Sequence, residues 1–197
     1  SDSDADVETL ANTIGRPCPA GEVRVADDEG VPTPAGVPGE IQVRAEFSMN
    51  GYLNRPEATR EAYTRDGWLR TGDTAVLRED GNIRFIGRRS EMFKSGGYNV
   101  YPREVELALE THEAVVLSAV VAVPDPLFDE VGWAYVVPAP GLALTEDEVA
   151  GWCRAHLANY KVPKRFFICR ELPLLPVGKV DKVLLKAQAR EAAAGGA

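Results

Sequence analysis

Two almost uninterrupted apolar runs constrain the fold of this 197-residue chain more than any other feature. They read VVLSAVVAV at residues 115–123 and VGWAYVV at residues 131–137. Strands that are covered on both faces lack the alternation of apolar and polar residues that half-buried strands show. We therefore expect two strands in the sheet of a small domain, with helices flanking that sheet.

Helical patterns lie on either side of these runs. The first expected helix has Pro102 in its first turn, and four of its residues share one face: Val105, Ala108, Leu109 and His112. A capping box at Thr145 and Glu148 opens a second helix, whose expected buried face comprises Val149, Trp152, Cys153, His156 and Tyr160. A strand at 165–169 and a helix at 182–194 follow. Because two strands separate the first two helices, the pattern indicates an α+β fold rather than a doubly wound sheet.

The first half of the chain is dominated by strand patterns. EVRVAD at 22–27 and EIQVRA at 40–45 alternate apolar and polar residues, and a Gly/Pro-rich connection joins them. Residues 74–87 contain two strands joined by Asp80-Gly81, a strong hairpin signal. A short helix is expected at 55–63. Residues 1–13 are polar, acidic and without apolar periodicity, so we expect them to be disordered.

The change of pattern places a domain boundary next to Ser90. Residues 1–89 form the β-rich part, and residues 90–197 form the α+β part.

Composition excludes several classes of function. A formal net charge of −8 argues against a general nucleic-acid binder, because neutralising phosphates provides most of that affinity. No apolar run approaches the roughly 18 residues of a membrane span, and no leader is visible, so a cytoplasmic protein is the default expectation. The three cysteines lack a C-x-x-C pair, which indicates reduced thiols. Both histidines fall on expected apolar helix faces and are interpreted as packing residues.

The segment GWLRTGD at residues 67–73 could bind a sugar. Asp73 follows a glycine turn at the expected entrance of a strand, where both carboxylate oxygens could accept hydrogen bonds from a vicinal diol such as a ribose. A capped turn, in which Asp73 binds its own backbone, explains the heptapeptide equally well.

The segment GRRSEMFKSGGYNVYPREVE at residues 87–106 could bind a ligand. Arg88 and Arg89 could contact phosphate or ribose, and Lys94 precedes Gly96 and Gly97, where a backbone without side chains allows close approach. A solvated basic loop leading into a helix is the alternative.

A third segment, LPLLPVGKVDK at residues 172–182, carries Lys179 on a loop before the last helix. A lysine in such a place can reach into a site formed elsewhere, although most surface lysines face solvent. No G-x-x-x-x-G-K-[ST] or G-x-G-x-x-G pattern is present, so neither familiar phosphate-cradling loop is expected.

Taken together, the stretches at residues 39–73, 87–106, 157–167 and 172–182 resemble four successive signatures of the acyl-adenylate-forming superfamily. That superfamily includes acyl-CoA synthetases, firefly luciferase and the adenylation domains of peptide synthetases. The residues GGYNVYPREVE resemble its acyl-CoA ligase branch more than its peptide-synthetase branch.

The resemblance implies a β-rich remnant of the large adenylation domain followed by a small, mobile C-terminal lid domain. The parent enzyme would convert an acid and ATP to acyl-AMP and pyrophosphate, and then acyl-AMP and CoA to acyl-CoA and AMP. The Mg²⁺ ligands, the phosphate loop and the acyl pocket would lie upstream of residue 1. The chain therefore resembles a fragment that is inactive alone. A non-catalytic docking or nucleotide- or carrier-binding module, or a fragment of an amino-acid adenylation domain, is the alternative.

The resemblance also implies roles for individual residues. Asp73 would bind the ribose hydroxyls, Arg88 the ribose and neighbouring phosphate, and Lys179 the acid carboxylate and α-phosphate. Gly96 and Gly97 would line the pantetheine path, with Lys94 near the thioester-forming centre. The remaining assignments are Asn99 in the nucleotide or CoA site and Ser90 at the hinge.

Two positions depart from the family pattern. The hinge residue, here Ser90, is usually Asp or Lys in that family. Where this chain has Asp129-Glu130, the family tends to have Gly-Glu.

Overall fold

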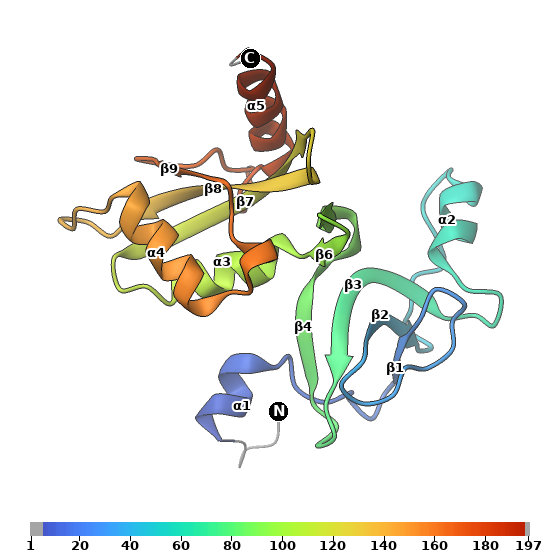
Figure 1. Ribbon diagram of the computed structural model, residues 1–197. Helices are drawn as coiled ribbons and strands as arrows, with labels where there is room; N and C mark the ends of the chain where they lie inside the picture. Colours follow the sequence, from blue (N-terminus) through green and yellow to red (C-terminus); the bar gives the residue numbers. More distant parts are fainter. Residues whose placement is uncertain (1–5, 196–197) are drawn as a thin grey trace. The chain divides into compact units, whose positions relative to one another are not determined.

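The computed structural model describes residues 6–195 and divides the chain into two compact units. The first unit extends to Ser90, and the second begins at Glu91. Figure 1 shows the elements of both units in chain order. None of the helices between residues 6 and 195 has both the length and the apolar character that crossing a bilayer demands.

Over its described residues, 6–90, the first unit contains an antiparallel four-stranded sheet in the order β1-β2-β3-β4. Its strands are β1 (Glu22–Ala26), β2 (Pro38–Arg44), β3 (Leu69–Leu77) and β4 (Ile83–Arg88). Its helices are α1 (Val7–Asn12) and α2 (Pro56–Ala62). Gly81 takes φ +80° in the turn between β3 and β4, which confirms the hairpin expected at Asp80-Gly81.

The core of the first unit is small. Ile41, Ala75 and Ile83 are its buried cluster. Beside that cluster, the ring of Trp68 is buried and has the guanidinium carbons of Arg24 and Arg44 at 4.3 and 4.5 Å from its centroid. Cation–π contacts of this kind add to apolar burial in holding the sheet together.

The expectation of disorder over residues 1–13 is wrong for the part that the structure describes. Asp6 accepts a hydrogen bond from Thr9 N at 2.7 Å and caps α1, and Ile14 N then donates to Ile83 O at 2.8 Å. No residue of α1 is buried, so the cap and the pairing with β4, rather than an apolar face, define this segment. Residues 1–5 lie outside the described residues.

Over its described residues, 91–195, the second unit contains five strands and three α-helices. Its strands are β5 (Phe93–Ser95), β6 (Tyr98–Val100), β7 (Val115–Asp125), β8 (Asp129–Pro138) and β9 (Arg165–Ile168). Its helices are α3 (Pro102–Glu110), α4 (Glu146–His156) and α5 (Lys182–Gly195), with short 3₁₀ turns η1 (Arg89–Glu91), which begins in the first unit, and η2 (Asn159–Lys161). The sheet order is β6-β5-β8-β7, and β9 pairs with β8 in parallel. The expected α+β class is confirmed.

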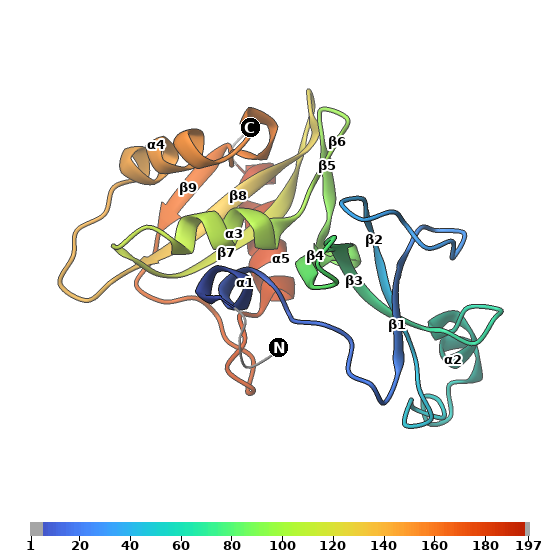
Figure 2. The same ribbon diagram turned by 90° about the horizontal axis from the view of Figure 1, so that it is seen from below.

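Both faces of β7 and β8 are covered, as the two apolar runs predicted. Figures 1 and 2 show α3 and α4 on one face of the sheet and α5 on the other. Val120 packs in the cluster with α3 and α4, whereas its neighbour Val121 packs in the cluster with α5. This alternation along one strand is what the twofold period of a strand requires.

Helix α4 begins as expected but ends earlier. The capping box is present, with Thr145 Oγ1 accepting from Glu148 N and Glu148 Oε2 accepting from Thr145 N. Leu157 is extended, so α4 ends at His156, and Tyr160 falls in η2 instead of on the helical face. Tyr160 is therefore exposed rather than buried.

The interpretation of both histidines as packing residues is only partly correct. His112 follows the end of α3 and is half-buried, with its ring edge-on to Trp152 at 4.9 Å between centroids. His156 is exposed and stacks on the same ring at 3.9 Å. Both contact Trp152, but neither is a core residue.

Cys153 is the buried cysteine, and its thiol is not activated. Burial raises the pKa of Cys153 to about 11, so its thiol stays protonated at neutral pH. All three cysteines are free thiols, and Cys18 is exposed.

Candidate functional site

Asp73 lies in a bulge of β3. Glu40 of β2 pairs with Thr74 and Gln42 pairs with Arg70, so residues 71–73 lie opposite a single β2 residue. Gly72 takes φ +73°, a left-handed conformation that glycine adopts without strain. The sequence placed Asp73 at a strand entrance; the structure places it inside β3, because the bulge accommodates the glycine turn within the strand.

Arg88 lies directly opposite Asp73 on β4. Its Nε is 2.9 Å from Asp73 Oδ1, and its Nη1 donates to Thr71 O at 3.3 Å. The Nε contact is an ion pair without hydrogen-bond geometry, and Oδ1 accepts no hydrogen bond from the described residues. The backbone N of Asp73 donates to Thr71 Oγ1 instead. Oδ1 is buried, and no backbone N–H of the described residues is shown donating to it, which disfavours the capped-turn alternative.

Glu40 of β2 stabilises the bulge through its side chain. This buried side chain accepts from Gly72 N at 3.3 Å through Oε1 and pairs with Arg70 Nη1 at 3.1 Å through Oε2. Gln42 Nε2 also donates to Oε2, at 3.3 Å. Sequence reasoning missed Glu40, although two polar residues at alternate positions of one strand indicate a polar cluster on one face of a sheet.

The electrostatics at Asp73 oppose its ionisation. Burial raises the pKa of the Asp73 carboxyl, Arg88 lowers it and Glu40 raises it, and the net result lies above the ordinary value. The folded chain therefore retains this proton to higher pH than the unfolded chain. The associated stability is present below the unfolded pKa of about 3.9 and is lost as pH rises through the folded pKa.

Asp73→Asn should accordingly not destabilise the first unit at neutral pH. We expect the free energy of unfolding at pH 7 to stay level or rise by less than about 1 kcal/mol, with the difference vanishing at pH 3. Urea unfolding at both pH values measures this. Asp66→Asn is the opposing control, since hydrogen bonds from Thr64 and Arg24 hold the pKa of Asp66 below its ordinary value and its loss should destabilise at pH 7. A loss above about 1 kcal/mol at pH 7 for Asp73→Asn would contradict the assignment.

The paired glycines form a turn rather than an open loop. Ser95 pairs with Tyr98, and Gly96 and Gly97 between them take φ +57° and +86°. Two consecutive positive φ angles define the type I′ turn that tight hairpins favour. Sequence reasoning missed this hairpin, because strands of three residues are too short to show a twofold period.

The hairpin gathers four of the expected site residues. Lys94 pairs with Asn99 across the two strands, and directly opposed residues of an antiparallel pair project to the same face. Lys94, Gly96, Gly97 and Asn99 are all exposed.

The turn is braced by the loop between β7 and β8. Gly96 N donates to Phe128 O at 2.9 Å, and a Cβ on Gly96 would meet Phe128 Cδ1 at 3.3 Å. Asp129, which pairs with Ser95, takes φ +70°. That is the conformation that a glycine, expected here from the family pattern, adopts most readily.

Aromatic rings and a lysine surround the Gly96-Gly97 turn. We call Tyr98, Phe128, Tyr160 and Lys164 the turn face. The rings of Tyr98 and Tyr160 stack at 4.6 Å between centroids and remain exposed, and Lys164 Nζ lies 4.8 Å from the Phe128 ring. Exposed aromatic rings beside a cation suit a planar base that carries phosphate. The sequence signal that could have predicted this cluster is the combination of Tyr160 with two lysines in YKVPK at residues 160–164.

Lys179 lies on a closed loop of its own. Leu174 and Val180 form a bridge, Leu175 N donates to Lys179 O at 2.7 Å, and Gly178 N donates to Leu175 O at 2.8 Å. Gly178 takes φ +79° after a turn that contains Pro176. The Lys179 side chain is exposed, which agrees equally with a lysine that reaches towards another site and with an ordinary solvent-facing lysine.

Ser90 and Arg89 belong to η1, at the end of the first unit. Ser90 is exposed, and Arg89 Nη2 pairs with Asp28 Oδ1 at 2.7 Å. Of the two adjacent arginines, Arg88 is therefore the one that accompanies Asp73.

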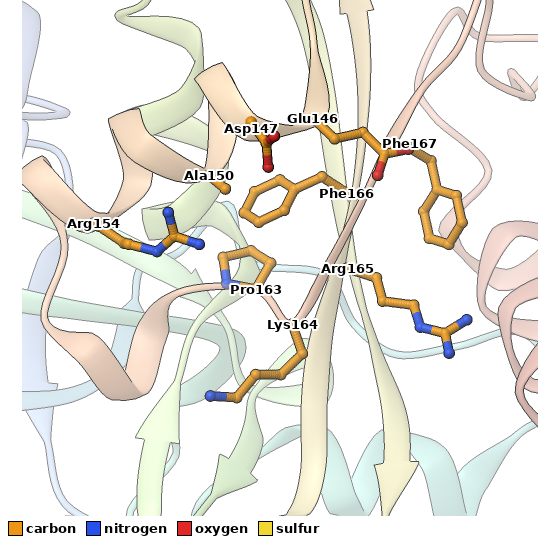
Figure 3. Close-up of a pocket in the computed structure, with 9 residues that line it drawn as sticks. All are labelled: Glu146, Asp147, Ala150, Arg154, Pro163, Lys164, Arg165, Phe166 and Phe167. Atoms are coloured by element: carbon orange, nitrogen blue, oxygen red, sulfur yellow. The ribbon is translucent and has the colours of Figure 1, made fainter.

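A pocket of about 430 Å³ opens between the start of α4 and β9, and Figure 3 shows its lining. The lining residues are Glu146, Asp147, Ala150, Arg154, Pro163, Lys164, Arg165, Phe166 and Phe167. Figure 3 shows Phe166 turned towards α4, with Phe167 turned to the opposite side of β9. Lys164 is its one residue shared with the turn face, and none of the sequence-predicted site residues lines it.

Two family models match the chain in order. The AMP-binding enzyme model matches residues 1–53, and the AMP-binding enzyme C-terminal domain model matches residues 104–179. The chain belongs to the AMP-binding, adenylate-forming enzyme family. The match to the C-terminal domain of this AMP-binding family ends at Lys179, while Asp73, Arg88 and the Gly96-Gly97 turn lie between the two matched regions.

Curated members of the AMP-binding family resemble the chain over most of its length. A 3-[(3aS,4S,7aS)-7a-methyl-1,5-dioxo-octahydro-1H-inden-4-yl]propanoyl:CoA ligase of Rhodococcus jostii (strain RHA1) is 45% identical, covering 93% of this chain and 34% of the relative. A feruloyl-CoA synthase of Amycolatopsis sp. is 43% identical, covering 90% of this chain and 36% of the relative. The chain thus spans about a third of the length of these relatives.

Solved adenylate-forming enzymes share the fold. The structure of the amide bond synthetase McbA from Marinactinospora thermotolerans aligns with a TM-score of 0.85 at 39% sequence identity, covering 91% of this chain and 37% of that chain.

Proposed function

We propose that this chain works as the C-terminal part of an ATP-dependent carboxylic acid:CoA ligase. The complete enzyme would convert an acid and ATP to acyl-AMP and pyrophosphate, and would then transfer the acyl group to the thiol of CoA with release of AMP. The observation that carries the proposal is the Asp73–Arg88 pair, whose buried Oδ1 accepts no hydrogen bond from the described residues, in a chain whose relatives are named as a CoA ligase and a CoA synthase.

In the first half-reaction, Asp73 would accept hydrogen bonds from the ribose hydroxyls of ATP. Arg88, held opposite by the β3–β4 pairing, would favour the ionised carboxylate against the opposing effect of burial, and would contact the ribose and the neighbouring phosphate. Lys179 would bridge the acid carboxylate and the α-phosphate, where negative charge grows as pyrophosphate leaves. Its exposed loop, which projects Leu174 and Val177 as well, suits docking against another folded part of the enzyme.

In the second half-reaction, the Gly96-Gly97 turn would give the pantetheine arm a path without side chains. Lys94 and Asn99, on one face of the same hairpin, would lie beside that path. The turn face offers rings for the adenine of CoA and Lys164 for its phosphates. A rotation at Ser90 would exchange the Lys179 loop for this hairpin between the two steps.

Magnesium is expected in the first half-reaction of such an enzyme. Within residues 6–195 no three His, Cys, Asp or Glu side chains gather closely enough to hold a metal ion, so no step assigned to this chain runs through magnesium.

Product analysis of the complete gene product tests the proposal. With ATP, CoA and a panel of fatty, aryl and terpenoid or sterol-derived acids, it should release one AMP and one pyrophosphate per thioester formed. The 197-residue chain assayed alone should form no thioester. Release of ADP would overturn the proposal, and an amide formed with added amines in place of a thioester would reassign the second step. Robust turnover by the isolated chain would contradict its assignment as a part of a larger enzyme.

A further inference from the structure

Lys182 stands between two carboxylates at the start of α5. Its Nζ lies 2.6 Å from Glu91 Oε2 and 2.8 Å from Glu106 Oε1. The side chain of Glu106 is only 3% exposed, whereas those of Lys182 and Glu91 are 25% and 34% exposed. One ammonium therefore joins three separate elements: η1, α3 and α5.

Glu106 is fixed independently of Lys182. Its Oε1 also accepts from Val120 N, at 2.9 Å, in the middle of β7. Burial by itself lowers the pKa of Lys182, but Glu106 and Glu91 outweigh it, and the net pKa lies above the ordinary value. Lys182 is consequently charged at neutral pH, and Glu106 attaches it to the sheet of the second unit.

The Lys179 loop is closed directly against Lys182. Asp181 N donates to Pro173 O at 2.8 Å, and Lys182 N donates to Val180 O at 3.1 Å. Asp181 Oδ1 accepts from Leu184 N at 3.0 Å, which fixes the first turn of α5. A displacement of the Lys182 backbone would therefore move the base of the loop.

Glu91 occupies an equally defined place. It follows Ser90 in the chain and is the first residue of the second unit. The contact with Lys182 thus joins the beginning of that unit to a loop that follows it by more than eighty positions in sequence.

We propose that Lys182 is a positioning residue that links the Lys179 loop to Glu91, so that a rotation at Ser90 carries the loop and the sheet as one rigid body. The inference rests on the proposed function for the roles of Lys179 and Ser90. A buried ion pair that served only global stability would leave the loop and Glu91 no more affected than the rest of the unit.

Amide hydrogen exchange in the 197-residue chain tests the link without any assay of activity. In Lys182→Met, exchange of amides in residues 89–92 and 174–181 should quicken together by about tenfold, while Val123 and Val136 in the sheet stay within about twofold of the parent. Lys186→Met, one turn further along α5, is the matched control and should change neither segment. Uniformly faster exchange throughout the unit, or unchanged exchange in either segment, would overturn the proposal.

Two further variants keep the test decisive. If Lys182→Met does not fold, Glu91→Gln removes the more exposed carboxylate, and the same two segments should exchange faster by a smaller factor. In the complete enzyme, Lys182→Met should slow acyl-AMP formation by about tenfold at unchanged KM for ATP, and Lys182→Arg should restore most of the rate. If Lys182→Met speeds exchange in both segments but the complete protein has no ligase activity, the Lys182 link is retained and the proposed function is rejected. If the complete protein is an active ligase but exchange in Lys182→Met equals that of the parent, the proposed function is retained and the Lys182 link is rejected.

Discussion

Lys179→Ala in the complete enzyme should slow acyl-AMP formation by about 100- to 1,000-fold while leaving thioester formation from supplied acyl-AMP within about threefold of the parent. The reason is that the ammonium would stabilise charge that develops only as the acid carboxylate attacks phosphorus. Pre-steady-state pyrophosphate release measures the first step, and thioester formation from synthetic acyl-AMP measures the second.

The structure supplies a control for that substitution. Lys186 lies on α5 of the same unit, so Lys186→Ala alters a lysine of that unit outside the loop. It should leave both half-reactions unchanged. Equal losses in the two half-reactions for Lys179→Ala would contradict a role confined to adenylation.

Alanine substitutions at three glycines should have a similar stability cost but different effects on the two half-reactions. Gly97, Gly141 and Gly178 take φ +86°, +82° and +79°, and a Cβ at each meets nothing within 4 Å. Each substitution should therefore cost about 1–2 kcal/mol of backbone strain in the second unit, measurable by urea unfolding.

The rates of the two half-reactions should distinguish the three variants. Gly97→Ala should lower thioester formation from acyl-AMP by about 100-fold, because a side chain would project into the path proposed for the pantetheine arm. Gly178→Ala should instead slow adenylation through the Lys179 loop, and Gly141→Ala should spare both steps. Parallel losses in all three variants would show that strain alone, rather than position, lowers the activity.

The parts of the fold that sequence reasoning predicted are those whose signals are local. The run at 115–123 has no polar alternation because both of its faces are covered, and the Thr145–Glu148 box specifies the start of α4 from four residues. The same helix ends where the backbone of Leu157 becomes extended, and no local sequence pattern predicts that change. The wrong placement of Tyr160 followed from that.

The candidate site divides in the same way. Asp73 and Arg88 could be named from their motifs, but their pairing depends on a bulge and on strand register, which are set by contacts across the sheet. Glu40 and Lys182 escaped prediction because each contacts partners that are distant in sequence. The roles of the named residues in catalysis stay predictions until the half-reactions are measured.

The brace between Gly96 and Phe128 has a consequence for how a ligand would be received. The turn is held by a hydrogen bond from Gly96 N to Phe128 O, in the loop between β7 and β8, and the neighbouring Asp129 takes a left-handed conformation and pairs with Ser95. A surface held in this way is pre-organised, so little conformational entropy is lost in ordering it when a ligand binds. Affinity at this turn would then depend on the shape already present rather than on folding around the ligand.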